Sequence, residues 1–160
     1  MMRRFFGGLF ETIHVLGAMV FLGTGAGSAW YKMRASRTDD ARVTAWCDVE
    51  IVRADWIFTV PAGVTMPLTG ALLVHLNGMP WTTPWILMGL LGYAIAGVFW
   101  LPAAWLQIRM RELSTRAAAA GEPLPAAYAR AQRAWTLLGV PSFLAAIVTI
   151  WVMVAKWAAW

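Results

Sequence analysis

Four apolar stretches, each about as long as a bilayer crossing, constrain this chain more than any other feature. They cover roughly residues 9–31, 56–77, 84–107 and 135–156, and about 20 apolar residues in a helix span the hydrocarbon core of a bilayer. Only 13% of the residues are charged, whereas about 25% are charged in soluble proteins. The sequence therefore predicts an all-α membrane protein: an antiparallel four-helix transmembrane bundle in a lipid bilayer, folded as a single domain over residues 1–160.

Basic residues collect in two of the three connections between these stretches. Residues 32–55 and 108–134 hold ten of the thirteen Lys and Arg side chains, while the short connection at 78–83 carries no charge. Positively charged connections stay on the cytoplasmic side of a membrane, so we expect both long connections to be cytoplasmic and both termini to lie on the outer side. The net charge of +5 therefore reports orientation and does not indicate a nucleic-acid partner.

The two long connections carry signals that start and stop helices. Asp39 and Asp40 can cap a helix that begins near Ala41, because Asp accepts hydrogen bonds from the first free N–H groups of a helix. Gly121 and Pro123 are typical of a helix end, and Pro125 suits the first turn of the next helix. These signals predict helical extensions of the bundle on the cytoplasmic side.

The two histidines of the chain, His14 and His75, lie on the first and second stretches. Because consecutive spans run antiparallel, both should lie near the outer face at comparable depth, about one to one and a half turns inside. Two neutral imidazoles that face one another across a bundle can ligate haem iron. We predict a haem b site with His14 and His75 as axial ligands and Glu11, one turn before His14, orienting the ring of His14.

Other interpretations of the same residues remain open at this point. Glu11 and His14, with a nearby methionine such as Met19, could hold a copper-like ion, which would indicate metal handling or transport. His75 lies close enough to the interface to make an ordinary structural hydrogen bond instead. A di-iron centre is not expected, because it needs carboxylates from all four helices.

A second polar group is expected at the cytoplasmic end. Asp55 enters the second stretch and Arg109 leaves the third, so antiparallel helices should bring them to similar depth. A buried charge needs a partner, and we predict an ion pair between Asp55 and Arg109. With Gln107 and Tyr31 nearby, this group could instead bind a quinone or an anionic head group.

Small residues in the first stretch suggest a contact with another helix. Gly23, Gly25 and Gly27 would let a second backbone approach closely, which favours a membrane protein partner or a second copy of the chain, with a non-catalytic subunit as an alternative function. The single Cys47 excludes an internal disulfide. The chain contains neither a glycine-rich phosphate loop nor a nucleophile elbow, and whether it is an enzyme stays open.

The chain resembles an uncharacterised bacterial family of four-span inner-membrane proteins, a domain-of-unknown-function family. The motifs that carry the resemblance extend over nearly the whole chain: His14-Val-Leu-Gly-Ala-Met-Val-Phe21-Leu-Gly23-Thr-Gly25, Ala54-Asp55-Trp56-Ile-Phe58-Thr59, Pro67-Leu-Thr-Gly70, Trp100-Leu-Pro102, Trp105-Leu-Gln107-Ile-Arg109-Met and Gly139-Val-Pro141. The resemblance implies a bacterial inner (cytoplasmic) membrane, which would make both termini periplasmic. It implies no activity.

A more distant similarity points to a cofactor. The pattern of His14, Phe21 and Gly23 is similar to the first helix of copper-resistance D-like proteins and of the HemJ-type protoporphyrinogen oxidase, whose haem b is held by histidine. The resemblance implies a ligand role for His14. Residues 26–30, Ala-Gly-Ser-Ala-Trp, replace the Tyr-Leu-Pro-Arg continuation of the HemJ type. We therefore expect a haem-b-binding redox protein that exchanges electrons with a quinone pool, and this departure leaves open whether the chain has that enzyme's activity.

Overall fold

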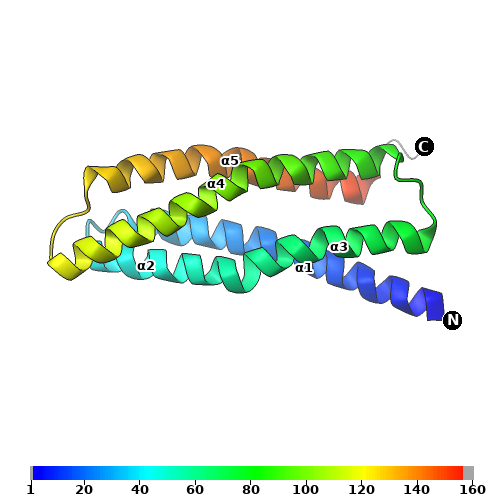
Figure 1. The fold of residues 1–160 in the computed structure, drawn as a ribbon, viewed down its shortest axis with the longest axis horizontal. Coiled ribbons are helices and arrows are strands. Elements are labelled where there is room, and N and C mark those ends of the chain that lie inside the picture. Colours follow the sequence, from blue (N-terminus) through cyan, green and yellow to red (C-terminus); the bar gives the residue numbers. More distant parts are fainter. Residues whose placement is uncertain (1, 157–160) are drawn as a thin grey trace.

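The computed structural model describes residues 2–156, and its regular structure is helical throughout (Figure 1). The helices are α1 (Met2–Ala35), α2 (Ala41–Ala54), the π-helical η1 (Asp55–Thr59), α3 (Val60–Asn77), α4 (Pro84–Ala120) and α5 (Ala126–Ala155). Because α2, η1 and α3 follow one another without a break, the described residues form four long helices, each apolar enough to cross a membrane. The predicted four-span, all-α architecture is confirmed.

The four long helices run antiparallel and extend beyond a single bilayer thickness. Loops 36–40 and 121–125 lie at one end of the molecule, and loop 78–83 lies at the other together with Met2 and Ala155 (Figure 1). We call these the two-loop end and the one-loop end. The 37 residues of α4 extend about 55 Å at 1.5 Å per residue, whereas the hydrocarbon core is about 30 Å thick. The predicted helical extensions are therefore present.

The extensions begin and end where the sequence indicates. The Asp40 side chain accepts hydrogen bonds from the backbone N–H groups of Arg42 and Val43, at 2.7 and 3.4 Å, and so caps α2. Helix α4 ends at Gly121, which has a left-handed φ of 68°, a conformation that glycine adopts without steric cost. Pro125 immediately precedes α5.

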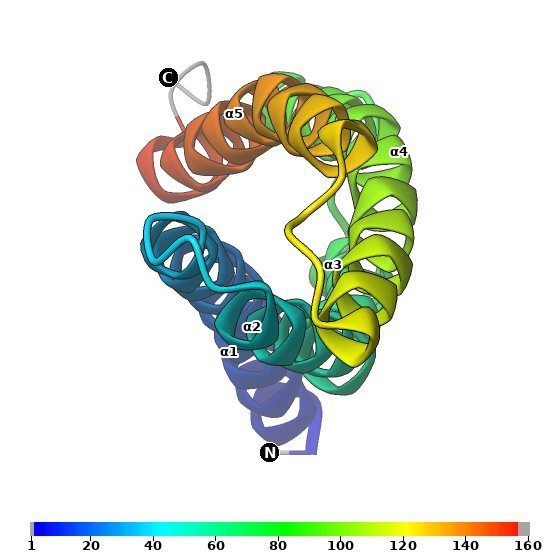
Figure 2. The ribbon, with the colours of Figure 1, turned by 90° about the vertical axis from the view of Figure 1, so that its left-hand side faces the viewer.

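The helices are arranged as two pairs that join at the two-loop end. Helix α1 packs on α3, α4 packs on α5, and α2 packs on α4. Seen end-on, they form an open arc with α1 and α5 at its two ends (Figure 2). No Cα atom of α3 lies within 8 Å of a Cα atom of α4, although one short loop joins these two fully described helices. The pairs are therefore close at the two-loop end and separated toward the one-loop end.

Two prolines shape the helix wall between the pairs. In η1 the Val60 N–H donates to the carbonyl of Asp55, five residues earlier, so this turn holds one residue more than an α-helical turn. The widened turn comes directly before Pro61, which has no N–H to donate and whose ring crowds the preceding turn. Pro67 leaves the carbonyl of Gly63 without its helical donor, and the Tyr93 hydroxyl of α4 donates to that carbonyl at 2.5 Å. Pro67 therefore creates the acceptor that ties α3 to α4.

Candidate functional site

An elongated cavity of about 820 Å³ lies between the two helix pairs, within the size range of small-molecule pockets. It extends from Asp55 and Gln107 to Leu68 and Tyr93, a length of about 20 Å along the helices. Most of its wall is apolar, and several aromatic side chains contribute: Phe21, Trp56, Tyr93, Trp100 and Trp105. Phe21 of α1 contacts Trp100 of α4 with ring centroids 6.4 Å apart. The cavity suits an apolar, partly aromatic molecule.

The end of the cavity nearest the two loops is polar. Asp55 and Gln107 are 8% and 7% exposed. The Thr59 hydroxyl donates to Asp55 Oδ1 at 2.7 Å, and the Gln107 side chain lies beside the same carboxyl. Two buried atoms here, Asp55 Oδ2 and Gln107 Oε1, have no hydrogen-bond partner among residues 2–156. A buried polar atom without a hydrogen bond costs about 1–3 kcal/mol, so a donor group of water or of a small molecule would be stabilised at this end of the cavity.

Asp55 and Arg109 have different partners in the structure, so the expected ion pair between them is not observed. Arg109 Nη1 donates to Glu112 Oε2 at 3.0 Å on the protein surface. Asp55 lies beside Gln107, two residues before Arg109 on α4. However, residues 107 and 109 are about 200° apart around a helix, so only one of them can face α2 and η1. Tyr31 is exposed and lies outside the cavity wall.

His14 lies in the contact between α1 and α3. Its Nδ1 is 2.9 Å from the Met66 carbonyl oxygen and 3.0 Å from Thr69 Oγ1. Since the Thr69 hydroxyl donates to the Thr65 carbonyl at 2.7 Å, the ring proton belongs on Nδ1, and Nε2 keeps its lone pair. A Cβ at Gly70 would lie 3.2 Å from His14 Cε1, so this glycine makes room for the ring.

His75 and Glu11 do not join His14 in one cluster. His14 is level with Met66–Gly70. His75 lies about 7.5 Å beyond Gly70 along α3, at the helical rise per residue, and its side chain is exposed. The side chains of Glu11 and Met19 are also exposed. Within the described residues, no group of three His, Cys, Asp or Glu side chains could hold a metal. The expectation that the two histidines share one depth is not met.

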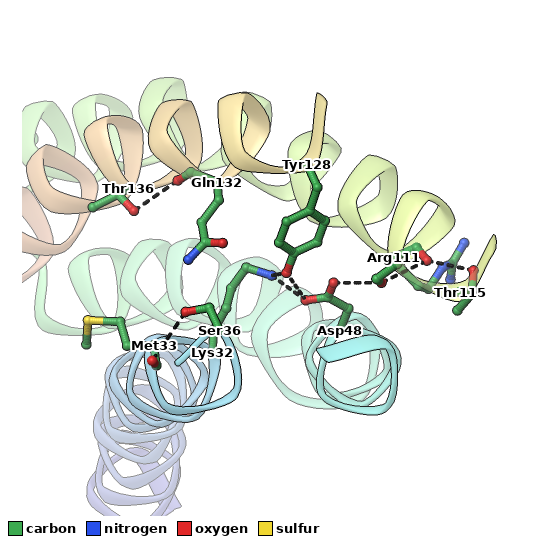
Figure 3. A network of polar contacts seen from close by, with 10 residues as sticks. Lys32, Met33, Ser36, Asp48, Arg111, Thr115, Tyr128, Gln132 and Thr136 are labelled. Carbon is green, nitrogen blue, oxygen red and sulfur yellow. Dashed lines mark hydrogen bonds and ion pairs between the residues drawn. The ribbon is translucent and has the colours of Figure 1, made fainter. Parts of the chain in front are cut away.

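A buried polar cluster that the sequence analysis missed lies at the two-loop end. Lys32, Asp48, Ser114 and Tyr128 come from α1, α2, α4 and α5, and each is at most 2% exposed. Lys32 forms an ion pair with Asp48 Oδ1. The Ser114 hydroxyl donates to Asp48 Oδ2 at 2.8 Å, and the Tyr128 hydroxyl donates to Asp48 Oδ1 at 3.3 Å. Figure 3 shows Lys32, Asp48 and Tyr128 converging between the helices.

Lys32 also connects the two ends of the helical arc. Its Nζ lies 5.4 Å from the ring centroid of Tyr128 and 5.6 Å from that of Trp135, both on α5, within the range of cation–π attraction. Helix α1 otherwise makes little contact with α5. The cluster therefore connects the helices at the two-loop end. The cavity lies next to the cluster, on the side that faces the one-loop end.

The small residues of α1 that were expected to contact another helix, Gly23, Gly25 and Gly27, are not covered by another described helix of this chain. A Cβ at Gly23, Gly25 or Gly27 would have no described neighbour within 4 Å. The surface predicted to contact another helix is therefore unoccupied within residues 2–156, and a protein partner there stays a prediction.

Comparison with known families agrees with this architecture. A family model described as a predicted integral membrane protein, DUF2269, matches residues 9–157. Searches of curated proteins and of solved structures found no match. The match covers nearly the whole chain, including most of α1, all of the other long helices and the residues around the cavity. The chain belongs to the DUF2269 family of predicted integral membrane proteins.

Proposed function

We propose that this protein binds a quinone of the membrane pool in the cavity between its two helix pairs. The observation that carries the proposal is the combination of an apolar, aromatic cavity of about 820 Å³ with two unpartnered polar atoms, Asp55 Oδ2 and Gln107 Oε1, at one end. Pockets of this kind hold a ligand by apolar contact and orient it through a few polar groups.

The shape of a quinone fits this arrangement. Its flat ring can stack on aromatic side chains. Trp56 and Trp105 line the cavity near its polar end, and Trp100 lines it farther along α4. Its isoprenoid tail can follow the apolar remainder toward Leu68 and Tyr93. Because quinones dissolve in the bilayer, the ligand can reach a cavity that lies between membrane-spanning helices.

The location we propose is the inner membrane of a bacterium, with the two-loop end in the cytoplasm and both termini in the periplasm. The support is the ten basic residues near the two loops and the positive-inside rule. This orientation would place Asp55 and Gln107 near the cytoplasmic boundary of the hydrocarbon core.

Quinone binding can be measured by quenching of tryptophan fluorescence. We expect saturable quenching when decylubiquinone is added to the protein in mild detergent, because three tryptophans line the cavity. Gly97 lines the cavity, and a Cβ there would meet nothing within 4 Å, so Gly97→Phe should fill the space. We expect this variant to bind at least about tenfold more weakly, a loss of about 1.4 kcal/mol.

The matched control for this titration is Gly139→Phe. Gly139 has equally open space at its Cβ position but lies outside the cavity wall. The Gly139→Phe variant should therefore bind decylubiquinone with the affinity of the unmodified protein. Equal binding by the Gly97→Phe and Gly139→Phe variants would show that the quinone does not occupy this cavity.

A second candidate function is electron transfer through haem b at His14. The supporting observation is the hydrogen bond from His14 Nδ1–H to the Met66 carbonyl oxygen. A histidine that ligates haem or a metal through one ring nitrogen usually donates a hydrogen bond from the other nitrogen in this way. His14 Nε2 is then the atom available to iron, and haem would supply one-electron chemistry. His75 lies at a different level of α3, so of these two histidines His14 is the one that would hold the haem iron.

Absorption spectra test the haem proposal. Protein from haem-replete cells is expected to show a Soret band and, after dithionite reduction, α and β bands. His14→Ala should remove these bands. If His75 is the second ligand, His75→Ala should remove these bands or convert the iron to high spin. If the spectrum of His75→Ala is unchanged, His14 is the ligand from this chain and His75 is not. A flat visible spectrum despite an adequate haem supply would contradict the proposal.

A further inference from the structure

We infer that the cavity between the two helix pairs also binds lipophilic organic cations, whose positive charge pairs with the buried carboxyl group of Asp55. Such a ligand combines one positive charge with a large apolar surface, and both features have counterparts in the cavity wall. The inference adds a second class of ligand to this cavity and does not depend on quinone binding.

Asp55 is a buried acid without a counter-charge from this chain. It is 8% exposed and belongs to none of the ion pairs of the described residues. Arg53 and Arg109, which are close to it in the helices, form exposed pairs with Glu50 and Glu112 instead. Within the described part of the chain, no Lys, Arg or His side chain lines the cavity. A buried carboxylate is strongly unfavourable without a partner, so the cavity offers a position for a cation.

The same helix face contains a carboxylate that has its cation. Asp48 lies about two turns before Asp55 and forms an ion pair with Lys32. Lys32 Nζ also lies 5.4 and 5.6 Å from the ring centroids of Tyr128 and Trp135. One carboxylate and two aromatic rings therefore hold a positive charge in the interior of this protein. Asp55 has aromatic neighbours of the same kind, but the described chain supplies no cation there.

The aromatic residues of the cavity wall suit the rest of such a ligand. Trp56 and Trp105 line the cavity near Asp55, and Phe21 and Trp100 line it farther along the helices. Aromatic rings attract cations over their faces, Trp most strongly, and they pack against apolar groups. The volume of about 820 Å³ is within the range of pockets for drug-sized molecules. A bulky organic cation fits this wall, whereas a metal ion would need several polar ligands.

The test is equilibrium dialysis of the full chain in mild detergent against tritiated tetraphenylphosphonium, with protein-free detergent as the background. We expect saturable binding that is at least about tenfold tighter than that of tetraphenylborate, an anion of similar size and shape. Asp55→Asn removes the negative charge at nearly constant shape and should weaken tetraphenylphosphonium binding at least about tenfold. Trp105→Leu removes an aromatic ring near Asp55 and should also weaken it. Glu112→Gln neutralises an exposed carboxylate outside the cavity wall and should leave the affinity unchanged.

The outcomes distinguish this inference from the quinone proposal. Absence of saturable tetraphenylphosphonium binding, or equal binding of tetraphenylborate, would overturn the cation inference even if decylubiquinone binds. An unchanged affinity of the Asp55→Asn variant, confirmed to be helical and monodisperse, would overturn the role of Asp55. An unchanged affinity of the Gly97→Phe variant would place the cation outside this cavity. Tetraphenylphosphonium binding by protein that does not bind decylubiquinone would overturn the quinone proposal alone.

Discussion

Replacing Lys32 with Met is expected to destabilise the folded protein by about 3–5 kcal/mol, because it leaves the buried carboxylate of Asp48 without its counter-charge. Lys32 and Asp48 are each 2% exposed, so water cannot take over the missing interaction. Ser114 and Tyr128 would still donate to the carboxylate, but neutral hydroxyls do not balance its charge. The loss should appear as a lower midpoint of thermal unfolding, followed by circular dichroism in mild detergent.

A double-mutant cycle separates the cost of an unpaired charge from the contribution of the pair. The double variant Lys32→Met with Asp48→Leu should be more stable than either single variant, because no charge remains buried. Arg53→Met is the control, since the exposed Arg53–Glu50 pair should contribute no more than about 1 kcal/mol. If Lys32→Met lowers stability no more than Arg53→Met does, the buried cluster is not formed as described.

Replacing Gly92 with Ala is expected to disrupt the contact between α4 and α5, the most extensive helix pairing in the molecule. A Cβ at Gly92 would lie 2.1 Å from Thr149 Oγ1 and 3.4 Å from Thr149 Cβ. The short, branched Thr149 cannot move aside as a long flexible chain would. Overpacking of this kind costs about 1–3 kcal/mol, and the unfolding midpoint should fall accordingly.

Two further variants identify the cause of that loss. Gly97 lies on the same helix with nothing within 4 Å of its Cβ position, so Gly97→Ala should be neutral or stabilising by up to about 1 kcal/mol through its higher helix propensity. Adding Thr149→Ala to the Gly92→Ala variant removes the clashing oxygen and should restore most of the stability. Equal unfolding midpoints for the Gly92→Ala and Gly97→Ala variants would contradict the described packing of α4 on α5.

Local features of the fold could be predicted from the sequence because their causes are local. The four apolar stretches, the cap at Asp40 and the helix end at Gly121 depend on neighbouring residues only, and the structure agrees with each. The alignment of one helix against another depends on side-chain packing across the bundle. His14 is level with Met66–Gly70 because Gly70 admits its ring, a relation that span lengths cannot reveal.

The polar residues show the same limit. The sequence indicates that Asp55 and Gln107 belong to one polar group. It does not show which face of α4 points inward, and for that reason Arg109 was wrongly expected to be the partner of Asp55. Lys32 was counted only as a loop charge. A signal for its cluster was nevertheless present, because Thr44, Asp48, Ile51 and Asp55 recur at spacings typical of one helix face, and all four are buried.

The most direct test of the central claim is to locate the quinone on the protein. A photoreactive azido-quinone can be cross-linked to the purified chain, and the labelled peptides can be mapped by mass spectrometry. The cavity predicts labels within residues 52–68 and 93–108, which line most of it, and loss of these labels when excess decylubiquinol competes. Labels confined to other segments, or unaffected by the competitor, would contradict quinone binding in this cavity.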